Sequence, residues 1–97
     1  MDDHLEDAGL DNSIFVGTKP FMNYVTGVVM QFNSGITEVT VKARGKYISR
    51  AVDVAEVVRK RFVQDTDIKE IRIDSEEFEG DEGKNVRIST IEIVLGK

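Results

Sequence analysis

Basic side chains at alternating positions are the residues of this sequence best suited to a chemical task. Lys42, Arg44 and Lys46 are each two residues apart, and in an extended chain such positions point to the same side. Lys19 lies in a second turn-forming segment, so folding could add it to the group. Grouped cations bind nucleic-acid phosphates by releasing counterions, without reading the base sequence. The alternative is an ordinary solvated loop, because surface lysines are common.

Two neighbours of these cations are candidates for contacts with the same ligand. Gly45 could let the backbone approach a phosphate closely, or it could be a turn residue that requires a positive φ. Asn23 could hydrogen-bond a phosphate or a ribose, or it could be an ordinary exposed polar residue. The sequence alone leaves both alternatives open.

Enzymatic chemistry has little support in this sequence. The absence of Cys excludes disulfides, thiolate metal sites and a cysteine nucleophile. The serines have no credible histidine base, because the single histidine, His4, lies in an acidic terminal segment. No phosphate-binding glycine motif is present. We therefore expect a protein that is not an enzyme and that uses no cofactor and no metal ion.

The net charge of −5 conceals an uneven distribution. Residues 1–12 hold five acids and no base, and residues 74–85 hold six acids and one base, whereas residues 13–73 hold ten bases and six acids. A polyanion responds to local charge, because salt screens charges beyond about 8 Å. The body is thus basic, and its acidic segments are appendages. We interpret residues 1–12 as a flexible acidic tail and residues 13–97 as one domain.

Hydrophobic periodicity predicts the elements that would position these residues. Ser13–Gly17 is typical of a short strand. A helix should follow, with Thr18 as its N-cap, Pro20 in its first turn and Gly35 as its left-handed C-cap. The apolar face of this helix, with spacings of three and four, consists of Met22, Val25, Val28, Val29 and Phe32.

The middle of the chain predicts a second strand and a second helix. The strand runs from Ile36 to Val41, and residues 42–46 follow as a basic loop. The helix runs from about residue 47 or 48 to Phe62, which is most simply a core residue. Its apolar positions are Ile48, Ala51, Val52, Ala55, Val58 and Phe62.

The last third of the chain predicts a long β-hairpin. Ile68, Ile71 and Ile73 begin one strand, and residues 86–95 form the other. The acidic segment between them has glycines near its turn and little to bury, so the hairpin should extend past the body. The predicted fold is α+β (an α/β sandwich) in the order β-α-β-α-β-β. It has a mixed four-stranded sheet, two helices on one face and parallel pairing across helical crossovers.

Four blocks of sequence resemble the Alba family of archaeal DNA- and RNA-binding chromatin proteins. They are GTKPFMNYV (17–25), VKARGKYISRAVD (41–53), VVRKRF (57–62) and RISTIEI (87–93), within a similarity that covers about residues 13–97. The resemblance implies the fold of the C-terminal domain of translation initiation factor three. It also implies a homodimer that binds double-stranded DNA and, in many members, RNA.

The resemblance implies roles for individual residues as well. The residues that it places at the nucleic acid are Lys19, Asn23, Lys42, Arg44, Gly45, Lys46 and Arg87. Phe62 matches an aromatic residue that makes contacts between dimers on DNA. Thr18 replaces the first of two lysines that the family commonly carries, so Lys19 is the remaining candidate for acetylation.

The acidic hairpin departs from this family, whose members mostly have a neutral or basic one. Its six carboxylates lack the spacing of an EF-hand loop, and we expect a solvated hairpin that resists edge-to-edge aggregation. We expect a protein that coats or bridges DNA as a dimer, with little sequence preference and more weakly than its basic relatives. One alternative is RNA protection or ribonucleoprotein assembly. Another is a protein-interaction module that uses the acidic tail and hairpin.

The expected location follows from the lack of a targeting or membrane segment. No apolar run approaches the roughly 18 residues of a membrane span. The acidic N-terminus does not have the form of a signal peptide. We therefore expect a cytoplasmic protein with no membrane partner, and the family resemblance implies that it is associated with the chromosome.

Overall fold

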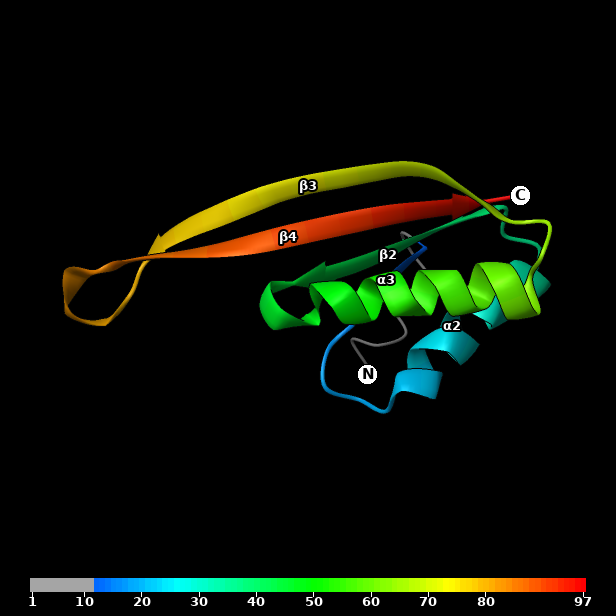
Figure 1. Cartoon of the computed structure of the whole chain (residues 1–97), viewed down its shortest axis with the longest axis horizontal. Helices are drawn as coiled ribbons and strands as arrows, with labels where there is room; N and C mark the ends of the chain where they lie inside the picture. The colour runs from blue at the N-terminus through cyan, green and yellow to red at the C-terminus, as the bar shows by residue number, and fades with distance from the viewer. Residues whose placement is uncertain (1–11) are drawn as a thin grey trace.

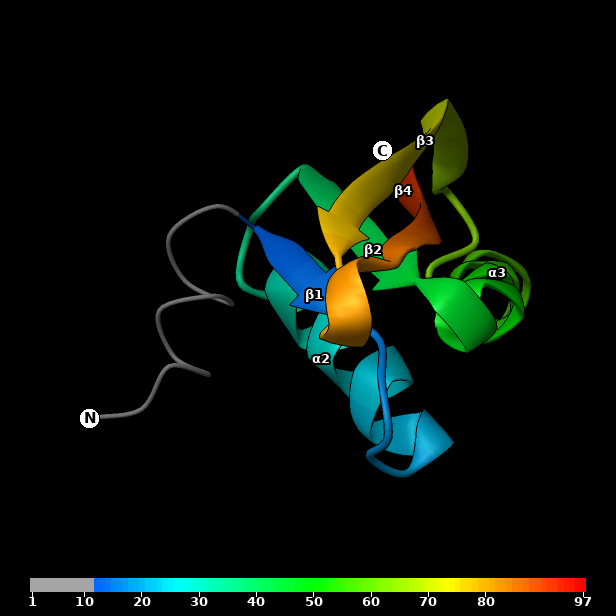
Figure 2. The same cartoon turned by 90° about the vertical axis from the view of Figure 1, so that its left-hand side faces the viewer.

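A computed structural model describes residues 12–97 and shows an α+β fold of two layers (Figure 1). One layer is a four-stranded sheet, and the other consists of two helices that cover one face of it (Figure 2). The order of elements is β-α-β-α-β-β. The predicted fold class is therefore confirmed. The predicted tail, residues 1–12, lies outside the described residues except for Asn12.

The sheet is mixed, as the sequence predicts. Its strands are β1 (Ser13–Phe15), β2 (Glu38–Arg44), β3 (Asp67–Glu79) and β4 (Asn85–Gly96), in the order β1-β2-β4-β3. β1 pairs with β2 in parallel, whereas β4 is antiparallel to both β2 and β3. The parallel pair is joined by a helix, which is the connection that such a pair requires.

The helices are α2 (Phe21–Asn33) and α3 (Ile48–Val57), and α3 continues in a π-helical turn from Val58 to Phe62. Their apolar faces pack on the inner face of the sheet. The fully buried side chains at this contact include Val25, Val28, Val39, Val41, Val54, Val58 and Leu95. Branched aliphatic residues thus fill the space between the layers, and the burial of each contributes about 1.5–3 kcal/mol.

The first helix begins later than predicted, so Thr18 is not its N-cap. Pro20 occupies the N-cap position with extended torsions (φ −55°, ψ 142°). The reason is steric, because a proline disfavours helical torsions in the residue before it. Lys19 therefore stays outside the helix. Gly35 has a φ of +100°, which confirms the predicted left-handed turn at the other end.

The buried stripe of α2 also differs from the prediction. Met22 is 49% exposed, and Tyr24 is buried in its place. The start at Phe21 turns Tyr24, Val25 and Val28 towards the sheet, and Met22 lies off that stripe.

The end of the second helix corrects the assignment of Phe62 to the core. Phe62 is 51% exposed, whereas Val63 is buried. The N–H of Val63 donates to the carbonyl of Val58 at 2.8 Å, a hydrogen bond that spans five residues. A π-helical turn holds more residues than an α-helical one, so it rotates Phe62 away from the core. Val52, another apolar position of the predicted helix, is also 41% exposed.

The second strand is displaced along the chain from its predicted position. It includes residues 42–44, which the sequence places in a loop. The long strand β4 provides pairing partners for them, with Lys42 opposite Glu92 and Arg44 opposite Thr90. Gly45 then begins a 3₁₀ turn (Gly45–Tyr47) with a φ of +59°, which confirms that it is a turn residue.

The β3–β4 hairpin extends past the helices, as predicted (Figure 1). Its pairing continues from Asp67 and Gly96 to Glu79 and Asn85, and the molecule is 47 Å long. Every residue of β3 is exposed. We call residues 74–90, the distal part of this hairpin, the arm. Among the described residues, no helix is long and apolar enough to cross a membrane.

Candidate nucleic-acid interface

Lys19 and Lys46 are both exposed, and each lies two residues before the start of a helix, α2 and α3 respectively. Lys19 lies in the connection between β1 and α2, and Lys46 lies in the 3₁₀ turn before α3. Arg50 of α3 joins these segments, because its guanidinium donates a hydrogen bond of 2.9 Å to the carbonyl oxygen of Gly17. Asn23 is exposed in the first turn of α2. We call Lys19, Asn23, Lys46 and Arg50 the loop surface.

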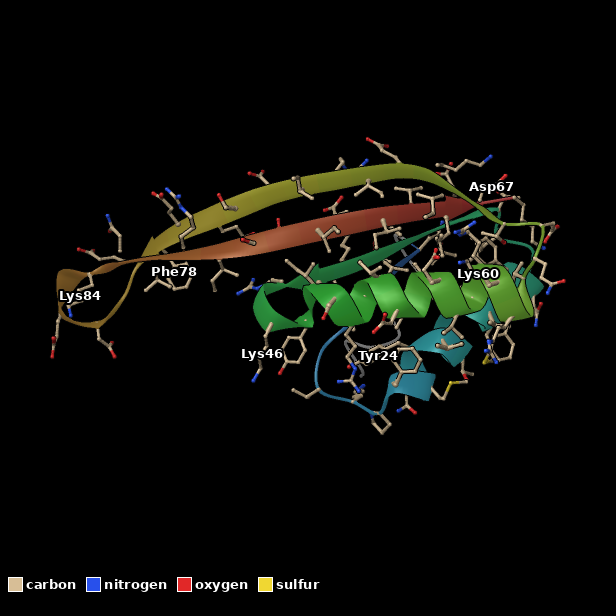
Figure 3. The ribbon with its side chains drawn as sticks, in the orientation of Figure 1. Tyr24, Lys46, Lys60, Asp67, Phe78 and Lys84 are labelled. Carbon is tan, nitrogen blue, oxygen red and sulfur yellow. The ribbon has the colours of Figure 1, made fainter. Side chains whose placement is uncertain are left out.

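The two lysines of the loop surface are available to an anion. The Lys46 ammonium lies 5.5 Å from the centre of the Tyr47 ring, a contact that leaves its charge intact. Within residues 12–97, neither Lys19 nor Lys46 forms an ion pair with a carboxylate. Figure 3 shows Lys46 pointing away from the sheet, on the side of the helices.

Lys42 and Arg44 lie on the other side of the sheet. Val41 and Ala43 are buried against the helices, so the alternating side chains of β2 project from the face that no helix covers. The prediction that Lys42 and Arg44 share one side is confirmed, but Lys46 lies beyond the strand and does not join them. The three alternating cations are therefore divided between two surfaces.

Both cations of the helix-free face have acidic partners. The Lys42 ammonium lies 3.9 Å from the Glu92 carboxylate and 5.3 Å from the centre of the Phe15 ring. The Arg44 guanidinium lies 3.5 Å from the Glu76 carboxylate, which belongs to the arm. Arg44 is exposed, but its charge is partly compensated by this glutamate of the β3–β4 hairpin.

A third cation on this face, Arg72, is held by two carboxylates. It pairs with Glu92 at 2.6 Å and with Glu70 at 2.7 Å. The hydrogen bond with Glu92, followed by that with Glu70, raises the pKa of the Arg72 guanidinium. The centre of the helix-free face is therefore close to neutral.

Arg87 lies on the arm and is also paired. Its Nε donates to the Glu77 carboxylate at 3.1 Å, and its Nη2 contacts the same oxygen. The pairing follows from the register of the hairpin, in which Glu77 and Arg87 are directly opposite. Of the cations that the resemblance places at a nucleic acid, only Lys19 and Lys46 lack a carboxylate partner within the described residues.

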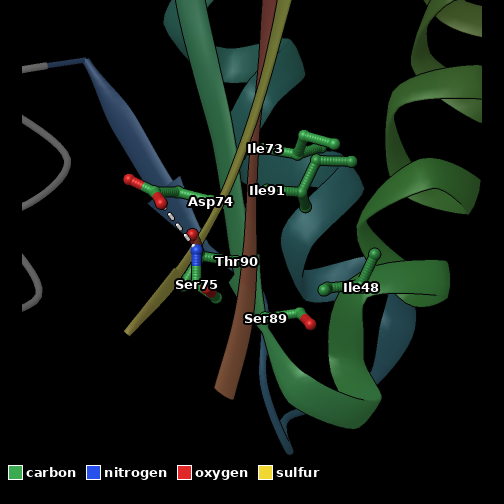
Figure 4. Close-up of a pocket in the computed structure, with 7 residues that line it drawn as sticks. All are labelled: Ile48, Ile73, Asp74, Ser75, Ser89, Thr90 and Ile91. Carbon is green, nitrogen blue, oxygen red and sulfur yellow. Dashed lines mark hydrogen bonds between the residues drawn. The ribbon is translucent and has the colours of Figure 1, made fainter. Parts of the chain in front are cut away.

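An apolar strip lies beside the root of the arm, on the helix side of the sheet. Ile71 and Ile73 of β3 are 54% and 77% exposed. An open groove between Ile73, Ile91 and Ile48 continues the strip to the start of α3 (Figure 4). The strip is therefore apolar surface that no part of the described chain covers.

Two parts of this arrangement were not singled out by the sequence pattern. Arg50 looks like any polar residue on a helix, and only its contact with Gly17 reveals its position. The pairing of Glu77 with Arg87 could have been found, because a turn centred near residue 82 places them opposite each other. Within residues 12–97, no cluster of three His, Cys, Asp or Glu side chains offers a candidate metal site.

Comparisons with known proteins give one family. A family model described as Alba matches residues 12–75. The DNA/RNA-binding protein Alba 1 of Archaeoglobus fulgidus is 59% identical over 87 residues, which cover 90% of this chain and 97% of that protein. The DNA/RNA-binding protein Alba of Methanocella arvoryzae is 58% identical over 85 residues, which cover 88% of each chain.

Solved structures agree with these relatives. Alba from Thermoplasma volcanium superposes with a TM-score of 0.82 at 51% identity, over 89% of this chain and 100% of that one. ALBA1 from Trypanosoma brucei gives a TM-score of 0.72 at 28% identity, over 89% of this chain and 68% of that one. Both share the α+β fold described above.

Proposed function

This chain belongs to the Alba family, and from that premise we propose that it is a DNA-binding protein of the chromosome, located in the cytoplasm. It coats or bridges double-stranded DNA as a homodimer, with little sequence preference and without enzymatic activity. The observation that carries the proposal is a pair of exposed lysines on the loop surface, Lys19 and Lys46, which form no ion pair with any carboxylate of residues 12–97. The relatives named DNA/RNA-binding protein Alba support it.

The binding mode is electrostatic. Lys19 and Lys46 contact phosphates, Asn23 hydrogen-bonds a phosphate or a ribose, and the absence of a side chain at Gly45 lets the backbone approach. Lys42, Arg44 and Arg87 contribute once their carboxylate partners are displaced. Phosphate contacts carry no sequence information, so affinity depends strongly on salt and weakly on sequence.

The apolar strip supports the homodimer. Ile71 and Ile73 lie on the outermost strand of the sheet, and a second copy of the chain would cover them and place two loop surfaces in one assembly. Ile73→Glu should therefore give a monomer in sedimentation equilibrium. Met30→Glu is the matched control, because Met30 is 63% exposed on α2. A dimeric Ile73→Glu protein would argue against this interface.

Phe62 supports contacts between dimers. Half of its surface is exposed at the end of the second helix, beside the cations of residues 59–61. Phe62→Ala should remove cooperativity on long DNA and keep the fold and single-site affinity. If the Phe62→Ala protein still binds long DNA cooperatively, Phe62 does not make contacts between dimers.

The acidic arm supports weaker binding than that of basic relatives. Six carboxylates lie in residues 74–85, and two of them pair with Arg44 and Arg87. Carboxylates near phosphates repel them, and paired arginines must first be released. Lys19 is exposed and remains the candidate for acetylation, which would remove its charge and weaken binding.

RNA is the second candidate ligand, because the relatives are named DNA/RNA-binding proteins. The lysines of the loop surface would bind the phosphates of either nucleic acid. Competition between duplex DNA and structured RNA at matched salt distinguishes the two.

The test of the proposed function is a mobility-shift titration over a range of salt concentrations, with DNA and with RNA. If a dimer makes roughly six to ten phosphate contacts, affinity should fall by about 10³–10⁵ between 50 and 200 mM salt. Lys19→Glu should weaken binding strongly, and Arg44→Glu should weaken it less. Absence of salt-sensitive binding by the unmodified protein would refute the proposal. Capture of basic proteins that persists in both variants would instead favour an interaction module.

A further inference from the structure

The connection between β1 and α2 is anchored by the buried residue Tyr24. Tyr24 is 7% exposed, and its ring belongs to the core. Its hydroxyl oxygen accepts a hydrogen bond of 2.9 Å from the backbone N–H of Lys19. A fixed group in the core thus holds the backbone of an exposed lysine.

A second contact braces the same connection from α3. The guanidinium of Arg50 donates to the carbonyl oxygen of Gly17 at 2.9 Å and lies 6.0 Å from the centre of the Tyr24 ring. Arg50 and Gly17 are 33 residues apart in sequence, so this contact links the connection to the other helix. The hydroxyl of Tyr24 also lies 3.7 Å from the position that a Cβ would occupy on Gly17.

These contacts restrain the backbone around Lys19, which lies in an irregular segment between β1 and α2. The carbonyl of Gly17 and the N–H of Lys19 are polar backbone groups of an irregular segment, which water would otherwise satisfy in many conformations. Pro20 further restricts Lys19, because it excludes helical torsions there. The backbone of Lys19 is therefore set relative to both helices, and only its flexible side chain remains to be ordered by a ligand.

We propose that Tyr24, braced by Arg50, is a positioning residue for Lys19 in nucleic-acid binding. This inference rests on the proposed function. A connection that is already in its binding conformation loses less entropy when phosphate binds, so the same charge gives a higher affinity. Tyr24 acts through the backbone of Lys19 and does not itself touch the nucleic acid.

Tyr24→Phe tests the inference without a change in charge or core volume, because the ring remains to pack and to face Arg50. Tyr47→Phe is the matched control. It removes the other tyrosine hydroxyl and keeps the ring beside Lys46. Tyr24→Phe should accelerate amide hydrogen exchange at Lys19. It should also weaken DNA binding by the proposed dimer about fivefold, since two hydrogen bonds are lost, each at the low end of its usual net value. Tyr47→Phe should change neither measurement.

A double-mutant cycle with Lys19→Gln separates positioning from general destabilisation. If Tyr24 acts through Lys19, Tyr24→Phe should cost nothing further in the Lys19→Gln protein. An equal loss in both backgrounds would overturn the inference, because a purely structural effect is additive. Equal affinity of Tyr24→Phe and Tyr47→Phe would overturn it too.

Failure of the inference differs visibly from failure of the proposed function. In the first case the unmodified protein binds DNA, Lys19→Gln weakens that binding, and the two tyrosine variants are indistinguishable. In the second case the unmodified protein shows no salt-sensitive binding at all. The inference then falls with the function on which it rests.

Discussion

The lysines of the loop surface and the arginines that contact the arm's glutamates are in opposite electrostatic settings. On the loop surface, Lys19 and Lys46 are exposed and, among the described residues, have no carboxylate partner. Beside and on the arm, Arg44 and Arg87 each pair with a glutamate of β3. The number of cations in a region therefore overestimates what it offers to a phosphate.

This difference suggests that the two regions contribute differently to DNA binding. An exposed ion pair contributes only about 0–1 kcal/mol to stability, but it must be broken before its cation can bind a phosphate. The lysines of the loop surface would thus supply most of the DNA affinity. The arm would raise or lower this affinity, depending on whether its glutamates release Arg44 and Arg87 or keep them paired. Substitutions in the two regions should then change the DNA affinity by different amounts and in opposite directions.

The largest effect is expected from the double variant Lys19→Gln/Lys46→Gln. Each phosphate contact contributes about a factor of five at 0.15 M salt, because the salt slope is about 0.9 per contact. The proposed homodimer would lose four contacts, so its DNA affinity should fall about 10³-fold and its salt slope by about 3.6.

Lys69→Gln/Lys97→Gln is the control for that experiment. It makes the same change in net charge at the other end of the sheet, where β3 begins and the chain ends. Mobility shifts should show little loss for this variant. Equal losses in the two double variants would mean that net charge, rather than the loop surface, carries the binding.

The second effect contrasts one cation from each setting. Lys19→Gln should weaken DNA binding by about 30-fold, from two contacts per dimer. Arg44→Gln should weaken it only about fivefold, because Glu76 competes for the guanidinium. In a Glu76→Gln background, the loss caused by Arg44→Gln should grow towards that of Lys19→Gln. An unchanged loss there would show that the ion pair does not limit Arg44.

The third effect has the opposite sign. Glu76→Gln/Glu77→Gln releases Arg44 and Arg87 and should raise the DNA affinity of the proposed dimer by about tenfold, since four exposed pairs are lost and each contributes about 0.3–0.4 kcal/mol. The control is Asp81→Asn/Glu82→Gln, which removes the same charge from the turn (Asp81–Gly83), where these residues form no ion pair with other described residues. An equal gain in DNA affinity in the two double variants would mean that general charge repulsion, rather than ion pairing, limits binding. No gain in either variant would mean that the carboxylates of the arm do not affect DNA binding.

The architecture could be predicted from the sequence because its determinants are local. The apolar positions Ile36, Val39 and Val41, the helical spacing of Val25, Val28 and Phe32, and the turn at Gly35 each reflect a single element. These patterns, with the four family blocks, gave the order of elements, the mixed sheet and the protruding hairpin.

The errors arise where one element depends on another. Residues 42–44 are in a strand only because β4 is long enough to pair with them. Phe62 is exposed only because a π-helical turn changes the spacing at the end of the second helix. The division of the cations between two surfaces depends on the position at which β2 ends, and the compensation of Arg44 depends on a glutamate 32 residues away.

The smallest expected effect is on folding stability, and it compares an ion pair of the arm with an ion pair of the second helix. In the second helix, Glu56 pairs with Arg59 at 2.9 Å and with Lys60 at 3.2 Å. The hydrogen bonds from Arg59 and then Lys60 lower the pKa of Glu56 below 4.5. A lowered pKa means that this stabilisation is present above about pH 4.5 and is lost as the pH falls through the lower value.

Glu56→Gln should therefore reduce the free energy of unfolding by about 0.5 kcal/mol at pH 7, the usual size for helical pairs three and four residues apart. The difference from the unmodified protein should shrink in urea titrations as the pH falls below about 4.5 and Glu56 becomes protonated in the folded protein. Glu77→Gln should cost less at pH 7, because its pair joins two exposed strands that nothing else covers. If Glu77→Gln costs as much as Glu56→Gln or more, the glutamates of the arm support the fold. Their pairing with arginines would then be no evidence that the arm restrains DNA binding.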